Sequence, residues 1–271
     1  MLAEVDRTAP FHVAASHDRA GDGGAEVIVQ QVGPGLFPGE ELLTEVAVGA
    51  GARLTLRGQA ATKLYPCPPG EEARAVTRLR VAAGGGLVSL PGELIPFRDA
   101  AYVSATEIDL DTGARLALAE IVTPGRVAMG ERDVYARLDL RLRLRVDGRP
   151  VLVERARLEP TRRPLTAPGR HGRFACAGTL VLAGYGAPDL GQGPSPRQGP
   201  EPESGPTGVW WGSGATAAGD VTIVRLLGPT AQALHAEIAR LLRVAAVASE
   251  DAATIGAVHT PGAERPWLHA G

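Results

Sequence analysis

A module of two short apolar strands joined by a glycine-bearing turn recurs along this chain at intervals of very roughly 30 residues. The four turns lie at residues 49–51, 84–86, 111–113 and 147–148. On either side of each turn, apolar residues alternate with polar ones, as in a β-strand with one buried face. Repetition of this kind is typical of stacked β-layers. It predicts a mainly β fold that resembles a β-helix or solenoid.

Composition and local pattern agree with many short extended elements. The chain has 35 glycines and 22 prolines, and only 4% of its residues are aromatic, so the core must be built from aliphatic side chains. In residues 138–146, leucines alternate with charged residues, which predicts one buried face and one wet face. The glycines at 84–86 have strands on both sides. We therefore expect a hairpin turn there, not a dinucleotide-binding loop.

One amphipathic helix is predicted near the C-terminus. Pro229 suits the first turn of a helix. The apolar residues that follow at helical spacing are Leu234, Ile238, Leu241, Leu242 and Ala245. The polar residues expected on the opposite face are His235, Glu237, Arg240 and Arg243. Such a stripe is typical of a helix that packs on a core.

These patterns divide the chain into five segments. We expect a flexible N-terminus at 1–24 and a β-stack core at 25–186. A Gly/Pro-rich insertion at 187–208 has almost no apolar residues and is expected to be disordered. The final strands and the C-terminal amphipathic helix of the same domain occupy 209–250, and a tail covers 251–271.

Charge and hydropathy exclude several classes of partner. A net charge of −2 and a pI near 6.3 give no electrostatic basis for binding nucleic acid or an anionic membrane. No stretch approaches the roughly 18 apolar residues that a membrane span needs. The first residues are acidic and lack the apolar run of a signal peptide. We therefore expect a cytoplasmic protein.

No constellation of catalytic residues is recognisable, so we expect no catalytic residue and no enzyme activity. The chain lacks a phosphate-binding loop and a nucleophile elbow. Its six histidines are scattered, and none pairs with another at metal-ligand spacing. Cys67 and Cys176 fit no disulfide framework or zinc spacing. Cys67 is a candidate for a weak, transient metal ligand, although a lone thiol beside prolines is more often inert.

Residues 59–65, Gln-Ala-Ala-Thr-Lys-Leu-Tyr, form a small-residue corner at the end of an extended segment. Prolines follow directly, so regular structure cannot continue. The corner carries an amide, a hydroxyl, an amine and a phenol, and Lys63 is the single lysine of the chain. These groups indicate a recognition surface. The candidates for partner binding are Gln59, Thr62, Lys63 and Tyr65.

Three carboxylates, Glu93, Glu120 and Glu131, lie in or next to apolar strands. A carboxylate is costly to bury unless it is paired, protonated or facing water. One interpretation is a structural ion pair between Arg126 and either Glu120 or Glu131. The other is an internal polar channel lined by Glu93, Glu120, Arg126 and Glu131, whose widely spaced oxygen ligands would hold a divalent metal weakly.

Several stretches together resemble the UreD (UreH) family of urease accessory proteins. In that family a strand ending in Thr-Gln-Ala-Ala-Thr-Lys-Val-Tyr is a recurrent signature, which residues 59–65 match closely. The stretches that agree with the family pattern in order and spacing are 49–54, 59–65, 90–97, 120–131 and 148–154. The strand and helix at 226–247 resemble the end of the family's sequences.

The resemblance implies a non-catalytic maturation factor built as a β-helix-like stack. It implies binding to a UreF-type accessory protein, through it to a UreG-type GTPase, and to apo-urease. Nickel would pass in transit through an internal tunnel, with no cofactor tightly bound. The resemblance places Gln59, Thr62, Lys63 and Tyr65 on a partner surface and Glu93, Glu120, Arg126 and Glu131 along the tunnel.

Two other functions remain open from the residues. A generic β-rich interaction module without a metal role would differ from a urease maturation factor only in its partners. A β-solenoid enzyme acting on carbohydrate would need an aromatic-lined groove, for which the aromatic content is too low.

Overall fold

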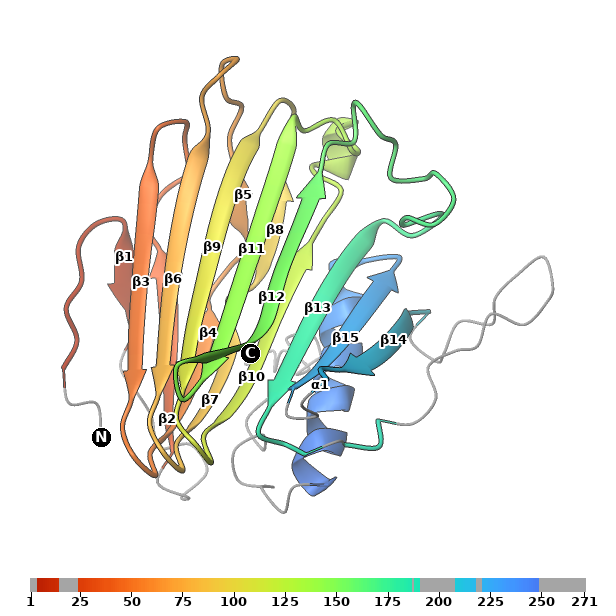
Figure 1. Ribbon diagram of the computed structural model, residues 1–271. Coiled ribbons are helices and arrows are strands. Elements are labelled where there is room, and N and C mark those ends of the chain that lie inside the picture. Colours follow the sequence, from red (N-terminus) through yellow and green to blue (C-terminus); the bar gives the residue numbers. More distant parts are fainter. Residues whose placement is uncertain (1–3, 15–23, 187, 191–207, 218–220, 249–271) are drawn as a thin grey trace, which may run out of the picture.

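The computed structural model describes residues 4–14, 24–186, 188–190, 208–217 and 221–248. Two β-sheets lie face to face, and one long helix packs on the outside of the larger sheet (Figure 1). The prediction of a mainly β, solenoid-like fold with a C-terminal helix is confirmed. No helix within these ranges is long and apolar enough to cross a membrane.

The elements follow in chain order. The ten-stranded sheet, here called sheet A, contains β1 (Phe11–Val13), β2 (Ala25–Gln31), β4 (Arg53–Gly58), β5 (Thr62–Leu64), β7 (Gly86–Leu90), β8 (Glu93–Pro96), β10 (Arg115–Val122), β13 (Cys176–Ala183), β14 (Trp210–Ala215) and β15 (Val221–Gly228). The five-stranded sheet, sheet B, contains β3 (Glu41–Val48), β6 (Ala73–Val81), β9 (Ala101–Leu110), β11 (Arg137–Val146) and β12 (Arg149–Leu158). The helices are the 3₁₀ helix η1 (Val127–Met129) and α1 (Ala231–Ala248).

The chain winds as a solenoid because successive strands alternate between the two sheets. In sheet B, β3, β6, β9 and β11 pair in parallel. In sheet A, β2, β4, β7 and β10 do the same. Each predicted module therefore supplies one strand to each sheet, except the last. β12, β13 and β15 then pair antiparallel to their neighbours and end the winding.

The prediction of a hairpin at residues 84–86 is wrong. This turn carries the chain from β6 in sheet B to β7 in sheet A, and the two strands do not pair. Turns of successive coils stack so closely that a Cβ on Gly85 would come within 2.9 Å of the Gly49 carbonyl oxygen. A hairpin does form at 147–148, where Asp147 and Gly148 both have positive φ. Two such residues give the type I′ turn that suits a two-residue hairpin.

Three apolar clusters form the core. Two of them lie between the sheets, one around Leu79 and Ile108 and the other around Tyr102 and Leu138. The third fills the space between the outer face of sheet A and α1. The predicted apolar stripe of α1 is buried in this third cluster. Most members of the clusters are aliphatic, and the aromatic residues Tyr102, Tyr135, Tyr185 and Trp211 are buried among them.

The start of α1 differs from the prediction. The helix begins at Ala231, and the Thr230 hydroxyl accepts a hydrogen bond from the Ala233 backbone N–H at 3.1 Å. Thr230 is therefore the N-cap, and Pro229 lies just before it. Glu237, expected on the polar face, is only 4% exposed. Arg240 donates to its carboxylate at 2.6 Å, which compensates for the loss of hydration.

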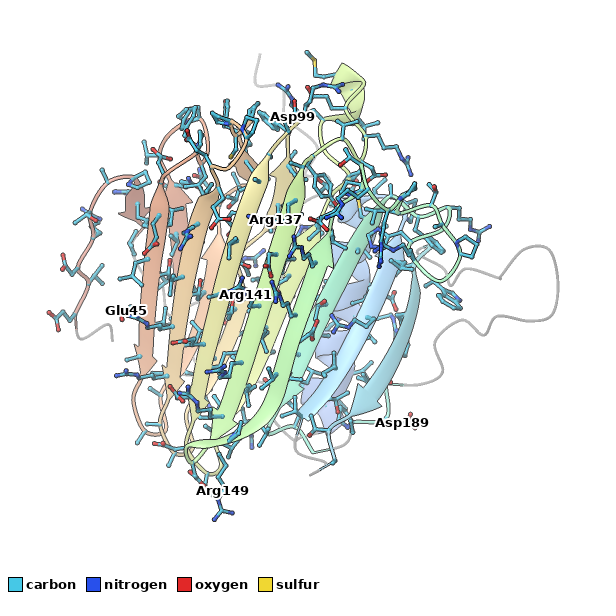
Figure 2. All side chains as sticks on the ribbon, turned by 45° about the horizontal axis from the view of Figure 1, so that its top comes forward. Glu45, Asp99, Arg137, Arg141, Arg149 and Asp189 are labelled. Atoms are coloured by element: carbon cyan, nitrogen blue, oxygen red, sulfur yellow. The ribbon has the colours of Figure 1, made fainter. Side chains whose placement is uncertain are left out.

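The outer face of sheet B is densely charged, and Figure 2 shows Glu45 and Arg141 on it. Asp139, expected on this wet face, is 3% exposed because two arginines cover it. Arg155 and Arg141 each donate two hydrogen bonds to its carboxylate. These bonds hold the pKa of Asp139 well below its usual range. This face therefore carries ion pairs both within β11 and between β11 and β12.

The predicted N-terminal segment, insertion and tail overlap only in part with the residues that the structure describes. Most of the 187–208 insertion and the 251–271 tail lie outside the described residues. Within the segment predicted as a flexible N-terminus, β1 pairs antiparallel with β2 and extends the edge of sheet A.

Candidate functional site

A polar layer crosses the interior between the two sheets and surrounds a cavity of about 170 Å³. On β6, Thr77 lies between Ala75 of one apolar cluster and Leu79 of the other. The polar side chains that line the cavity are Gln31, Thr44, Arg57, Thr62, Thr77, Ser89, Tyr102, Ser104, Thr106 and Glu120. The layer therefore separates the two apolar clusters and runs across the strands, along the axis of the solenoid.

Threonines from successive coils form one wall of this layer. Thr44 pairs in register with Thr77, and Thr77 with Thr106. Each lies at the same height on its strand, so the three hydroxyls follow one another from coil to coil. The Nε2 atom of Gln31, which also lines the cavity, is buried without a hydrogen-bond partner within the described part of the chain. The wall can thus offer hydrogen bonds to a small polar guest.

Glu120 on β10 faces the threonine wall from sheet A. Burial raises the pKa of its carboxyl group to about 7, and the negative charge of Glu154 adds to this effect. A hydrogen bond with Thr106 acts in the opposite direction. Glu120 is thus a carboxyl group whose charge changes near neutral pH.

The layer ends at the open side of the solenoid in a group of charged and polar residues. Thr179 on β13 pairs with Glu120 on one side and with Arg225 of β15 on the other. Arg225 donates to the Thr179 hydroxyl at 2.6 Å and forms an ion pair with Glu154 of β12. The Oε2 atom of Glu154 is buried without a hydrogen-bond partner in the described residues. This ion pair connects sheet B to sheet A beside Glu120.

A second group of residues stacks at one corner of the solenoid. The rings of Phe37 and Tyr65 are stacked with centroids 4.4 Å apart, and Phe97 follows at 4.9 Å from Tyr65. The guanidinium group of Arg126 lies over Phe97 at 3.9 Å. Arg126 in turn forms two hydrogen bonds with Glu131, at 2.8 and 2.6 Å, which lower the pKa of that carboxyl group. The structural ion pair considered from the sequence is therefore formed by Arg126 and Glu131.

The four recognition candidates of the 59–65 segment do not share one surface. Gln59 lines a hollow on the outside of sheet A. Thr62 lines the internal cavity. Lys63 is exposed, and Tyr65 belongs to the aromatic stack of the corner. The side chains of the segment thus point both to the internal cavity and to the surface. Its role in partner binding stays a prediction.

The four tunnel candidates are also separated. Glu120 lines the cavity between the sheets. Arg126 and Glu131 lie at the corner described above, and neither lines this cavity. Glu93 lies outside, under α1, where its Oε2 atom is 3.0 Å from Nε2 of His235. This hydrogen bond is the main cause that lowers the pKa of Glu93.

The hollow that contains Glu93 and His235 has a volume of about 380 Å³. Its walls come from three places: the end of β4 with the 59–61 corner, the β7–β8 junction with β10, and the first turns of α1. Both side chains of the pair reach solvent, with 27% of Glu93 and 36% of His235 exposed. The hollow is therefore a mainly apolar recess between sheet and helix, in which Glu93 and His235 form a polar pair.

Cys67 lies just after the corner and is partly buried. Its Sγ atom is 3.4 Å from the Ala101 carbonyl oxygen, to which the thiol donates. Within the described ranges, no group of three or more His, Cys, Asp or Glu side chains could hold a metal ion. A transient role for Cys67 stays a prediction.

Sequence reasoning did not identify the threonine wall or the pairing of His235 with Glu93. The threonines had a usable signal, because Thr44, Thr77 and Thr106 recur about one module apart. The pair of His235 and Glu93 had no signal in the sequence, since the two residues are 142 positions apart. They meet only because α1 folds back over sheet A.

Known proteins resemble this chain over most of its length. The family model described as UreD urease accessory protein matches residues 1–257. A protein from Sorangium cellulosum named Urease accessory protein UreD is 38% identical over 160 residues, covering 59% of this chain and 50% of that protein. Its namesake from Brucella suis is 38% identical over 161 residues, covering 59% and 57%. The one from Rhodopseudomonas palustris is 42% identical over 139 residues, covering 51% and 48%.

The chain spans about half the length of the curated relatives it matches. The family description names an accessory protein, which agrees with the expectation that the chain is not an enzyme. It also agrees with the motifs at 59–65 and 120–131 that suggested the resemblance. The chain belongs to the UreD family of urease accessory proteins.

Proposed function

We propose that this protein is a urease maturation factor, a scaffold that binds other accessory proteins and apo-urease and assists the insertion of nickel. Membership in a family of urease accessory proteins supports the general role. The polar layer inside the solenoid is the observation that favours a part in metal transfer over a purely adhesive one. Placing a carboxylate and a line of hydroxyls between two apolar clusters costs free energy, and partner binding alone does not require it.

Nickel is the cargo in this proposal, and the layer would offer it weak oxygen ligands in succession. The hydroxyls of Thr44, Thr77 and Thr106 lie on one wall, and the Glu120 carboxylate faces them. Hydroxyl and single carboxylate oxygens are poor ligands for nickel compared with imidazole or thiolate. A lining of this kind favours passage over retention.

The partners would be a UreF-type accessory protein, a UreG-type GTPase held through it, and apo-urease. The exposed Lys63 and the Gln59 side chain remain the proposed recognition groups of the 59–65 segment. The aromatic corner supports the same proposal, because Phe37 is 37% exposed and the neighbouring η1 carries exposed Val127 and Met129. Apolar side chains grouped at one corner are typical of a surface that a partner covers.

Co-expression with a UreF-type protein and apo-urease tests the role directly. We expect the three proteins to co-purify, and nickel-dependent urease activity to appear only when this chain is present. Absence of both the complex and the activity would refute the maturation role. A complex without any effect on activity would favour the generic interaction module.

A further inference from the structure

The parallel ladder of sheet A is interrupted beside Glu120. Ser89 of β7 pairs with Leu118 of β10, and Glu93 of β8 pairs with Ile121. Three residues separate Ser89 from Glu93, but only two separate Leu118 from Ile121, so one extra residue bulges from the β7–β8 side. The break lies opposite Ala119 and Glu120, which keep only their pairing with β13 on the other edge of β10.

The internal cavity and the outer hollow meet at this break. Five residues line both of them: Arg57, Gly58, Ala60, Gly92 and Ile121. Glu120 lies on the inner side, and the adjacent Ala119 lies on the outer side. The polar layer and the hollow under α1 are thus separated by the thickness of one interrupted sheet.

We propose that His235 and Glu93 form a binding site for a divalent transition-metal ion in this outer hollow. The inference rests on the proposed function, because nickel is the ion that the protein would encounter there. An imidazole nitrogen and a carboxylate oxygen are ligands that nickel, cobalt and zinc accept. Both side chains are held by regular elements, α1 and β8, and both are open to solvent.

The geometry of the pair suits a metal ion. Nε2 of His235 and Oε2 of Glu93 are 3.0 Å apart. If each lay about 2.1 Å from an ion, the nitrogen–metal–oxygen angle would be about 90°. That angle corresponds to adjacent positions of an octahedron, with water in the remaining ones. The ion would lie to one side of the line between the two atoms, and their hydrogen bond would be lost with release of its proton.

The surroundings of the pair can assist binding. Gln232, one turn before His235, and Gln59 both line the same hollow, and their amide groups can hydrogen-bond to metal-bound water. Arg57 also lines the hollow, and its positive charge faces Glu26 in an ion pair. Two protein ligands give a weak site, and a weak site can exchange its ion with the Glu120 layer beyond the break in the sheet.

Nickel binding by the full chain tests the site. Metal-free wild-type protein and the variants His235→Gln and Glu93→Gln are titrated with nickel chloride in competition with a colorimetric chelator. His12→Ala is the matched control, since His12 is an exposed histidine on β1. Thermal unfolding of each variant shows whether it is folded. His259 and His269 are present in every variant, so any contribution they make cancels in the comparison.

We expect both glutamine variants to lose one nickel equivalent or to bind it about tenfold more weakly or worse, a difference of about 1.4 kcal/mol, while His12→Ala binds as wild type. Equal nickel binding by wild type and His235→Gln would contradict the proposed site. The pair would then be only a hydrogen bond that connects α1 to β8. The co-expression assay tests the proposed function separately. Loss of nickel binding in the variants without activation of apo-urease by wild type would keep the site and refute the function.

Discussion

The surroundings of Glu120 shift the pKa of its carboxyl group in two opposite directions. Burial and the charge of Glu154 raise its pKa to about 7, whereas the hydrogen bond with Thr106 favours the ionised form. Near neutral pH the carboxyl group is therefore present in both forms. A carboxyl group with this property destabilises the fold when it is ionised in the interior.

Replacing Glu120 by glutamine should change how stability depends on pH. The pKa of Glu120 is higher in the folded protein than in the unfolded chain, so its neutral form stabilises the fold at low pH. That contribution is complete below about pH 4 and is lost as pH rises through about 7. We expect Glu120→Gln to unfold with nearly wild-type free energy at pH 4 and to be more stable by about 2 kcal/mol at pH 8. Urea unfolding at both pH values measures this. A difference that does not change with pH would contradict the environment described for Glu120.

Among the elements, the turns between the sheets decide how closely the coils stack. The turn at 84–86 lies directly against the turn at 49–51, and the Gly85 position leaves no room for a Cβ. The two oxygens that a Cβ would meet, on Ala82 and Gly49, both lie within 2.9 Å and belong to the backbone, which cannot move aside easily. A glycine is thus required by packing at this position, although its φ is ordinary.

A pair of glycine-to-alanine variants tests this stacking. Gly85→Ala should lower the free energy of unfolding by about 1–3 kcal/mol, because the added methyl group forces the coils apart. Gly49→Ala, in the stacked turn, should change it by less than about 0.5 kcal/mol, since no atom lies within 4 Å of its Cβ position and surface changes of this kind cost little. Chemical unfolding of the two variants gives the comparison. Equal losses of stability in both would show that the turns are not packed as described.

At the scale of the whole molecule, the sequence predicts what is periodic and local. Alternation identified the strands, the glycine turns identified the coils, and the apolar stripe identified α1. It could not show that the turn at 84–86 crosses between sheets, because a hairpin and a crossing have the same local pattern. That difference depends on whether the next strand pairs with its predecessor or with the coil below it.

The candidate site illustrates the same limit. Glu93, Glu120 and Glu131 all lie in or next to strands that alternation predicts, yet only Glu120 of the three lines the internal cavity. Glu131 follows η1 and turns back to Arg126, and Glu93 follows the bulge and points toward α1. One extra residue in the β7–β8 junction is enough to change which side of the sheet a carboxylate faces. Such a shift is visible only once the coils are in register.

The central claim is that the polar layer takes part in nickel insertion, and nickel incorporation into apo-urease tests it most directly. Apo-urease would be matured at limiting nickel with wild-type chain, with Glu120→Leu, or with Glu107→Leu as the control on the outer face of β9. Glu120 is partly buried, so thermal unfolding of Glu120→Leu is measured alongside to show that the variant remains folded. We expect the nickel content of urease to fall about tenfold with Glu120→Leu and to be unchanged with Glu107→Leu. Full nickel incorporation with Glu120→Leu would contradict the claim.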